Sequence, residues 1–467
     1  MKTTRREFLY STGLTAGGVL AGVGLTSATS PAQPPVKVRP DVSTLDPNGP
    51  ELRALRAGVG ALKQLPESSP RHWAALARIH SGFCPHRNWF FLPWHRAFVL
   101  HFEQICREAS GDPDFMLPYW DWANSPRVPA PFWGAGNPLM HTRRIRPDNS
   151  ASPSFAGQRV LYGANNFGGI LRVTDFITFA GGIATSQRRG SSAGRLEGGP
   201  HNYIHSFIGG DMGGMTSPLD PIFWLHHANV DRLWTEWERL SPGRTTSNPR
   251  WLDFSLEGFD GIRPQNQPAL KVSDTLSTYP LGYRYPSQPA TPPSPQPLAA
   301  APEAAQPELH AERTIDAQAT TREPLSFAIT ASSALQNRVR RAATTPTAAL
   351  GDTRTRLRLV LEVEPPETPL IGVRVFLSFQ TPVPNRQFGD PNYVGSFTFF
   401  GQEHEGHGSG DEAAIRFAFD VTRTIRKLAR AGLYRANSDL QVSLVPVSLG
   451  AERGTVNLVR FKLEAIG

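Results

Sequence analysis

The sequence is poor in cysteine, in long apolar runs and in clustered charge. Its 467 residues include two cysteines, Cys84 and Cys106, too few for a disulfide framework, so stability must come from packing and from any bound metal. Beyond residues 1–30, no stretch is long and apolar enough to span a bilayer. The formal net charge is +8, but basic residues alternate with acidic ones and form no basic stripe. We therefore expect neither a membrane protein nor a nucleic-acid-binding protein.

Residues 1–30 predict an export signal. Arg5 and Arg6 stand ahead of a mildly apolar, glycine-rich stretch at 14–25, and a run of small residues and Pro31 follow. This pattern resembles a twin-arginine signal. A membrane anchor is the alternative, but the apolar stretch is far shorter than the roughly 20 residues that a spanning helix needs. We expect the protein to leave the cytoplasm by the twin-arginine pathway and to be secreted or periplasmic.

The chain divides into segments of different composition. We expect a helical core domain at 40–245, because this segment is rich in Trp, Phe and His and its apolar residues recur with helical periodicity. A middle segment at 246–285 follows, and 286–318 is expected to be a linker because it is rich in Pro and Ala and poor in large apolar residues. The helical periodicity is clearest at 90–108, 201–207 and 221–238.

The last segment, 319–467, shows the alternation of apolar and polar residues that is typical of strands. The alternation is clearest at 356–363 and 441–447, and short strands of this kind favour a β-sandwich. Within this segment, 336–352 is polar, basic and without periodicity, so we expect an exposed loop that proteases can reach. The sequence therefore predicts a mainly α fold, in which a helical-bundle core domain is followed by a C-terminal β-sandwich domain.

Histidine is the residue type whose spacing is most informative. His201 and His205 stand four apart, so on a helix both imidazoles leave the same face and can hold one metal ion. A zinc protease would carry Glu after the first histidine, but Asn202 stands there, and the Glu-x-x-His pairs of a di-iron site are absent from 40–245. Ligands that are all imidazoles suit copper. Six of the thirteen histidines form two triplets: His80, His86 and His95, then His201, His205 and His227.

Two segments around these histidines carry a family resemblance. Residues 86–96 read HRNWFFLPWHR and resemble the first copper signature of tyrosinases, catechol oxidases and molluscan haemocyanins, and residues 220–231 read DPIFWLHHANVD and resemble the second. The family pattern places a ligand four residues before Asp231, which selects His227 and leaves His226 as a structural imidazole beside it. The resemblance implies two copper ions, dioxygen as co-substrate and a small phenol as substrate. It assigns one ion to His80, His86 and His95, and the other to His201, His205 and His227.

Cys84 lies two residues before His86. In fungal tyrosinases a Cys-x-His pair forms a thioether, so the resemblance implies a covalent link between Cys84 and His86 that would fix the orientation of that imidazole. A buried cysteine without this link is the alternative. Cys106 is expected to be a core residue.

The resemblance also bears on which phenols are oxidised. Glu197 matches the plant glutamate that positions a water, and Asn202 matches the residue that polarises this water in tyrosinases. A carboxylate, a water and an amide so arranged can act as a base. We therefore expect the enzyme to hydroxylate monophenols as well as to oxidise o-diphenols to o-quinones. The other interpretation of Glu197 is a surface carboxylate in a glycine-rich loop. The nearby run 190–194, GSSAG, mimics a serine-hydrolase elbow but follows no strand.

The downstream segments resemble plant polyphenol oxidases. Residues 281–285, LGYRY, are similar to the middle segment of those enzymes, and 393–397, YVGSF, to their carboxy-terminal domain. In that family this domain covers the copper entrance and keeps the enzyme latent until it is cleaved or displaced. The resemblance thus implies a shielding domain at 319–467 and an activating protease as a partner.

Other functions share these motifs. An oxygen carrier like haemocyanin has the same copper signatures and a β domain over the site, although a single unit behind a twin-arginine signal argues against a carrier. A copper store without activity is another alternative. Small or flexible residues at 213–215 suggest an open entrance to the copper site, which would admit larger phenols or o-aminophenols. An enzyme that oxidises only o-aminophenols is therefore a further alternative.

Overall fold

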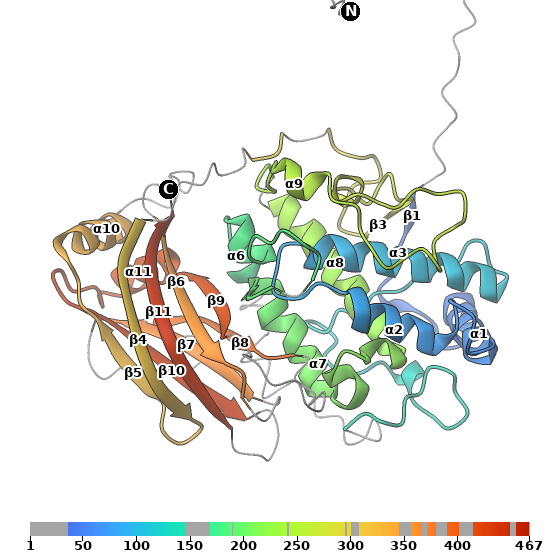
Figure 1. The fold of residues 1–467 in the computed structure, drawn as a ribbon, viewed down its shortest axis with the longest axis horizontal. Coiled ribbons are helices and arrows are strands. Elements are labelled where there is room, and N and C mark those ends of the chain that lie inside the picture. The colour runs from blue at the N-terminus through green and yellow to red at the C-terminus, as the bar shows by residue number, and fades with distance from the viewer. Residues whose placement is uncertain are drawn as a thin grey trace, which may run out of the picture. The chain divides into compact units, whose positions relative to one another are not determined.

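The protein is described here by a computed structural model that covers residues 36–145, 169–188, 190–240, 242–294, 297–299, 308–344, 356–366, 371–379, 390–400, 414–448 and 454–466. The expected export signal at 1–30 lies outside these residues. Figure 1 shows the helices of the first half of the chain gathered in one region and the strands of the last third in another. The predicted fold class, a helical core followed by a β-sandwich, is confirmed.

The helices of the first region are α1 (Pro50–Gln64), α2 (Trp73–Phe83), α3 (Phe91–Ser110), α6 (Phe176–Ala180), α7 (Asn202–Ile208), α8 (Ile222–Leu240) and α9 (Pro249–Leu252). The three stretches with clear helical periodicity form α3, α7 and α8, as predicted. α2 begins after His72, whose ring accepts the N–H of Ala74, and α3 ends at Gly111, where a left-handed backbone (φ 71°) favours glycine. Among the described helices, none combines the length and apolarity needed to cross a bilayer.

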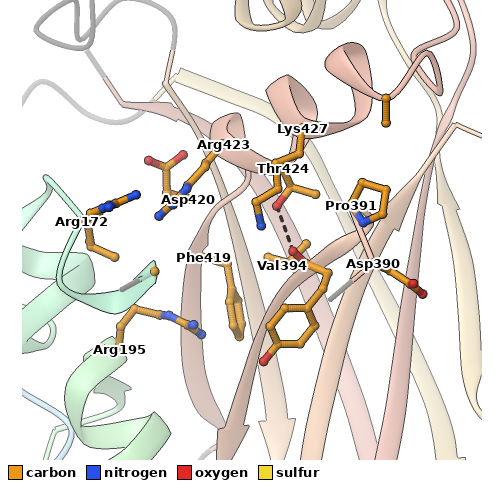
Figure 2. A pocket seen from close by; sticks show the side chains of 14 residues that line it. Arg172, Arg195, Asp390, Pro391, Val394, Phe419, Asp420, Arg423, Thr424 and Lys427 are labelled. Atoms are coloured by element: carbon orange, nitrogen blue, oxygen red, sulfur yellow. Dashed lines mark hydrogen bonds between the residues drawn. The ribbon is translucent and has the colours of Figure 1, made fainter. Parts of the chain in front are cut away.

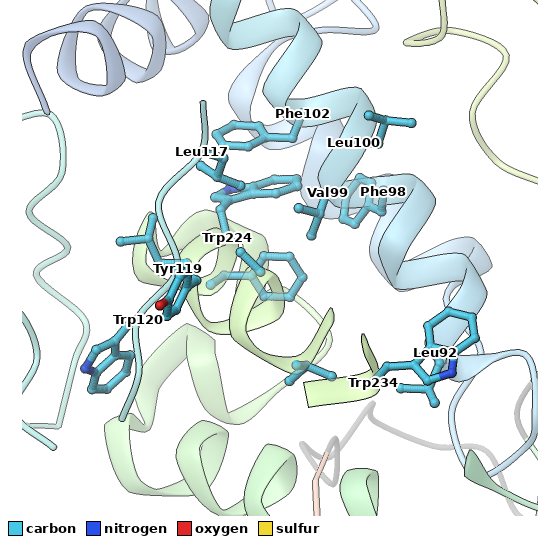
Figure 3. Packing of buried hydrophobic residues seen from close by; sticks show 14 of the residues in the cluster. Leu92, Phe98, Val99, Leu100, Phe102, Leu117, Tyr119, Trp120, Trp224 and Trp234 are labelled. Atoms are coloured by element: carbon cyan, nitrogen blue, oxygen red, sulfur yellow. The ribbon is translucent and has the colours of Figure 1, made fainter. Parts of the chain in front are cut away.

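Helices α3 and α8 pack against each other through large aromatic side chains. The rings of Phe102 and Trp224 are stacked with centroids 3.7 Å apart, and the ring of Phe98 lies 4.7 Å from that of Trp224 (Figure 3). Nearly every residue in the first four turns of α3 is buried, because the helix runs through the interior. Since His95 lies on α3 and His227 on α8, this close packing fixes the directions in which both imidazoles point.

The second region is a two-layer sandwich. Phe327 and Phe461 come from opposite sheets, and their rings stack 4.9 Å apart in a shared apolar core. One sheet has the order β5-β10-β7-β8 and the other the order β2-β9-β6-β11-β4. The strands are β2 (Ser192–Ala193), β4 (Glu308–Thr320), β5 (Leu325–Ile329), β6 (Arg356–Glu364), β7 (Ile371–Ser378), β8 (Tyr393–Thr398), β9 (Ile415–Asp420), β10 (Leu440–Ser448) and β11 (Thr455–Ile466), and two helices, α10 (Ser333–Thr344) and α11 (Thr422–Arg430), pack with them.

Two expectations about this region need correction. Strand β4 begins at Glu308, inside the expected linker 286–318, because an edge strand paired only with β11 is largely exposed and needs few large apolar residues. The expected loop 336–352 begins as the helix α10, whose residues Leu335, Val339 and Ala342 are buried. These three apolar residues recur at helical spacing, but the basic residues between them hid the helical pattern in the sequence.

One strand joins the two regions. β2 comes from the helical half of the chain yet pairs in parallel with β9 at the edge of the five-stranded sheet. On its other side, the N–H of Gly190 donates to the carbonyl of His86 (2.7 Å) and the N–H of Ser192 donates to that of Arg87 (3.0 Å). A Cβ at position 190 would lie 2.3 Å from the Arg87 oxygen, so glycine is required there. The run 190–194 is therefore a structural bridge.

A buried ionic cluster holds the middle segment against the core. Asp231 on α8 accepts hydrogen bonds from the hydroxyls of Tyr283 (2.8 Å) and Tyr285 (2.6 Å), and it pairs with Arg96 on α3 and with Arg39 (3.3 Å). The short strands β1 (Lys37–Val38) and β3 (Tyr283–Arg284) pair beside this cluster. The LGYRY motif thus fastens the chain to α8 directly and, through Asp231 and Arg96, to α3.

Candidate metal centre

The six histidines of the two triplets are placed by different elements. In the first triplet, His80 lies in the last turn of α2, His86 in the connection to α3, and His95 near the start of α3. In the second, His201 ends a wide turn at Glu197–His201, His205 lies on α7, and His227 on α8. All six side chains are buried, none more than 3% exposed. Segments far apart in the chain therefore meet inside the helical region.

The two triplets lie next to each other. The rings of His95 and His227 stack with centroids 4.4 Å apart, and the rings of His86 and His201 lie 5.7 Å apart. Within each triplet the ligand atoms lie within 4.8 Å of one another; the first set also includes Cys84 and the second His226. This spacing is that of two adjacent metal sites, each with three imidazoles.

Backbone carbonyls orient three of the rings. The Nδ1 atoms of His80, His95 and His205 lie 2.7, 2.8 and 2.6 Å from the carbonyl oxygens of Met215, Phe91 and Met212. A carbonyl oxygen only accepts, so each Nδ1 carries the proton and each Nε2 presents its lone pair. This is the arrangement found around metal-binding histidines, in which a hydrogen bond to one nitrogen fixes the other as the ligand.

Glu197 and Asn202 orient two further rings. A carboxylate oxygen of Glu197 lies 3.0 Å from Nδ1 of His86, and the N–H of Arg87 donates to both Glu197 oxygens (2.8 and 3.0 Å). Asn202 donates its amide N–H to the carbonyl of Thr398 (3.0 Å), so its oxygen faces Nδ1 of His201 (2.9 Å). The predicted pair is thus brought into the centre, and each member contacts a histidine of a different triplet.

Glu197 is not a surface carboxylate. Its side chain is 1% exposed, and burial raises its pKa to about 8, although the N–H of Arg87 opposes this shift. Arg87 itself has a positive φ of 62°, which is rare for a residue other than glycine. The backbone beside His86 therefore adopts an unfavourable conformation that directs one N–H at the carboxylate.

Burial keeps the imidazoles neutral, which is the form that binds metal ions. It lowers the pKa of His201 to about 3 and also lowers the pKa of His95, His205 and His227, with neighbouring imidazoles adding to the effect. Among the described residues, Nε2 of His95 and of His201 has no hydrogen-bond partner, which is costly for a buried polar atom unless an ion binds there. An all-nitrogen donor set suits copper, and the two buried clusters fit a binuclear copper centre.

The position of one nitrogen bears on the choice between His226 and His227. Nε2 of His227 lies 3.3 Å from Nε2 of His205, which is about the spacing of two imidazoles that share one tetrahedral ion with bonds of roughly 2.0–2.1 Å. The ring of His226 stacks 5.2 Å from that of His201 and lies 6.0 Å from Trp122. This distance supports His227 as the third ligand, which stays a prediction because the ring of His226 lies 4.8 Å from that of His205 and its nitrogen belongs to the same set.

A side chain of the β region, not foreseen in the sequence, reaches the same centre. The ring of Phe400, which follows β8, lies 4.3 Å from that of His205, 4.9 Å from that of His86 and 5.6 Å from that of His201. The hydroxyl of Ser206 donates to the carbonyl of Phe399 (2.9 Å) and helps to hold this segment against α7. Phe400 thus contacts histidines of both triplets, and only two consecutive phenylalanines after a strand hint at it in the sequence.

Comparisons with known proteins agree with this geometry. Residues 62–164 and 135–240 match the family model described as the common central domain of tyrosinase. Tyrosinase HcTyr1 of Hahella sp. (strain CCB-MM4) is 31% identical over 423 residues, which are 83% of this chain and 85% of that protein. The chloroplastic (+)-larreatricin hydroxylase of Larrea tridentata is 28% identical over 54% of this chain and 49% of its own length, so the match spans about half of that plant relative.

Solved structures share the fold of both regions. Latent apple tyrosinase matches with a TM-score of 0.67 and 21% identity over 94% of this chain and 98% of that one. A latent aurone synthase (polyphenol oxidase) matches with a TM-score of 0.65 and 20% identity over 92% of this chain and 90% of that one. The arrangement of a helical core and a β-sandwich is therefore shared with both.

Proposed function

The chain belongs to the tyrosinase family and is a copper-dependent oxidase of phenols, and we propose that it uses dioxygen to convert o-diphenols into o-quinones. The observation that supports this most is the convergence of buried, neutral imidazoles into two adjacent sets. We assign one copper ion to His80, His86 and His95, and the other to His201, His205 and His227.

Bound copper would supply the transfer of electrons from the phenol to dioxygen. The protein's own contribution is to hold the ligands and to exclude water. Glu197 and Asn202 fix the rings of His86 and His201 through Nδ1, so Nε2 of each ring would be the atom that holds copper. We propose in addition a thioether between Cys84 and His86, because the sulfur lies within 4.8 Å of the ligand atoms. A C–S bond would replace the thiol S–H and a ring C–H, and dioxygen, the co-substrate, would accept the two electrons and two protons released. A tryptic peptide lighter by two hydrogen atoms would establish that link.

We also propose that monophenols are hydroxylated. The raised pKa of Glu197 allows this carboxylate to take and hold a proton near neutral pH, and it lies at the edge of the first triplet. A phenol O–H that reaches this edge would lose its proton through a water to Glu197. The names of two relatives, a tyrosinase and a hydroxylase, agree with such an activity.

Latency is the next part of the proposal. Phe400 covers histidines of both triplets, and the contacts of Asn202 with Thr398 and of Ser206 with Phe399 keep it there, so we propose that a phenol enters on this side. The β region would therefore hold the enzyme inactive until it is displaced. We propose that an activating protease cuts between β3 and β4, after Tyr285 and before Glu308, and that the twin-arginine signal exports the enzyme.

One assay tests the function. Copper-loaded protein, before and after limited proteolysis, is given a monophenol, a catechol and an o-aminophenol, while dioxygen consumption and product absorbance are followed. We expect the catechol to form quinone while dioxygen is consumed, and we expect the rate of quinone formation to be higher after cleavage. Reversible dioxygen uptake without turnover of any substrate, even after cleavage, would instead identify a carrier, and turnover of the o-aminophenol alone would narrow the substrate class.

A further inference from the structure

A cavity away from the metal centre lies where the β region meets the helical region. Its volume is about 640 Å³, within the range of about 300–1,000 Å³ that is usual for small-molecule sites. One wall is formed by Gly169, Arg172, Val173 and Arg195, and the other mainly by residues of β8, β9 and α11. Figure 2 shows Arg172 on one side and Arg423 and Lys427 on the other.

Three basic side chains line this cavity, and the carboxyl of Asp420 lies near one of them, Arg423. Arg172, Arg423 and Lys427 form no ion pair within the described part of the chain. Burial and then the nearby charge of Arg172 lower the pKa of Arg423, whereas the carboxyl of Asp420 raises it. Burial and then the charge of Arg423 lower the pKa of Lys427. Like charges held together at a partly buried site are relieved when an anion binds between them.

The other charged groups of the cavity do not cancel this charge. Arg195 is a fourth cation, but it donates to the carbonyl of Ser396 (3.1 Å) and stacks over Phe419. Asp390 and Asp420 are the acidic groups of the lining. Asp420 accepts the N–H of Thr422 (2.9 Å), and burial raises its pKa, which disfavours its charged form. Four basic groups against two acidic ones leave a positive cavity.

The rest of the lining is apolar. Phe419, Val394, Pro391 and Val173 form a surface beside the cations, and the cavity is larger than an inorganic oxyanion needs. We propose that this cavity binds an organic oxyanion, such as an aryl phosphate, sulfate or carboxylate, with its charged end on Arg172, Arg423 and Lys427 and its ring on Phe419 and Val394. Because the cations come from both regions, the bound ligand bridges them. If the proposed latency is correct, the bound ligand therefore favours the latent form of the enzyme.

Isothermal titration of the copper-loaded full chain with phenyl phosphate and with inorganic phosphate tests the site. We expect saturable 1:1 binding of phenyl phosphate, with inorganic phosphate at least tenfold weaker because it lacks the ring. The double variant Arg423→Gln/Lys427→Gln, and separately Arg172→Gln, should weaken phenyl phosphate binding at least tenfold. Lys427→Arg keeps the charge and should keep the binding. Arg340→Gln, an exposed charge on α10 outside the lining, is the matched control.

The outcomes separate this site from the oxidase proposal. Binding that is absent, or that is equally strong in the wild type and in both charge-removing variants, overturns the site, whatever the oxidase activity. Equal affinities for the two phosphates overturn the choice of an organic ligand. Circular dichroism of each variant confirms its fold, and because Arg172→Gln lies on the other wall, it keeps the test decisive where the double Gln variant does not fold.

Discussion

Replacing Phe400 with alanine in the intact chain should open the metal centre. Burying a phenylalanine side chain stabilises by roughly 1.5–3 kcal/mol, and Phe400 is 6% exposed against the rings of His86, His201 and His205. A phenol must displace this ring before it can bind. Since about 1.4 kcal/mol corresponds to a factor of ten, its removal should raise kcat/KM of the intact chain for catechol roughly 10- to 150-fold.

The assay compares wild type, Phe400→Ala and Phe400→Leu before and after proteolytic removal of the β region. Leucine retains much of the apolar cover, so its gain should be smaller. After removal of the β region, wild type and both variants have the same sequence, so their activities should coincide. An intact Phe400→Ala variant that is folded, fully loaded with copper and no more active than wild type would refute the reasoning that this ring blocks the site.

Three further changes test the roles given to single residues. Glu197→Gln keeps an acceptor for Nδ1 of His86 but cannot hold a proton in the same way, so monophenol turnover should fall at least tenfold while catechol turnover changes little; parallel loss of both activities would leave only a positioning role. His227→Phe should lower bound copper from two ions to one per chain, whereas His226→Phe should retain two, as measured by elemental analysis; the reverse result would exchange their roles. Asp231→Asn breaks the buried cluster and should lower the free energy of unfolding by about 3–5 kcal/mol, and a denaturation midpoint equal to that of wild type would contradict this.

Motifs that act locally were readable in the sequence. The spacing of His201 and His205 predicts one shared helical face. In the structure His205 lies on α7, and His201 is the residue directly before the start of that helix. The long periodic stretches predicted α3 and α8 because apolar residues on a helix must recur every third or fourth position. The ligand assignments themselves remain predictions that the geometry supports.

Features that depend on packing between distant segments were not readable. Strand β4 is stabilised by pairing with β11 at the far end of the chain, and α10 by packing against α11, so neither shows a strong local pattern. The contact of Phe400 with His205 depends on how the β region lies on the core. Glu197 is acidic and lies in a glycine-rich run, and only the fold shows that it is buried against His86.

The central claim is that six imidazoles hold two copper ions side by side. It is tested most directly by a crystal structure of the copper-loaded protein with anomalous scattering measured at the copper absorption edge. We predict two peaks, one among Nε2 of His80, His86 and His95 and one among Nε2 of His201, His205 and His227. A single peak, or a peak outside these triplets, would contradict the account.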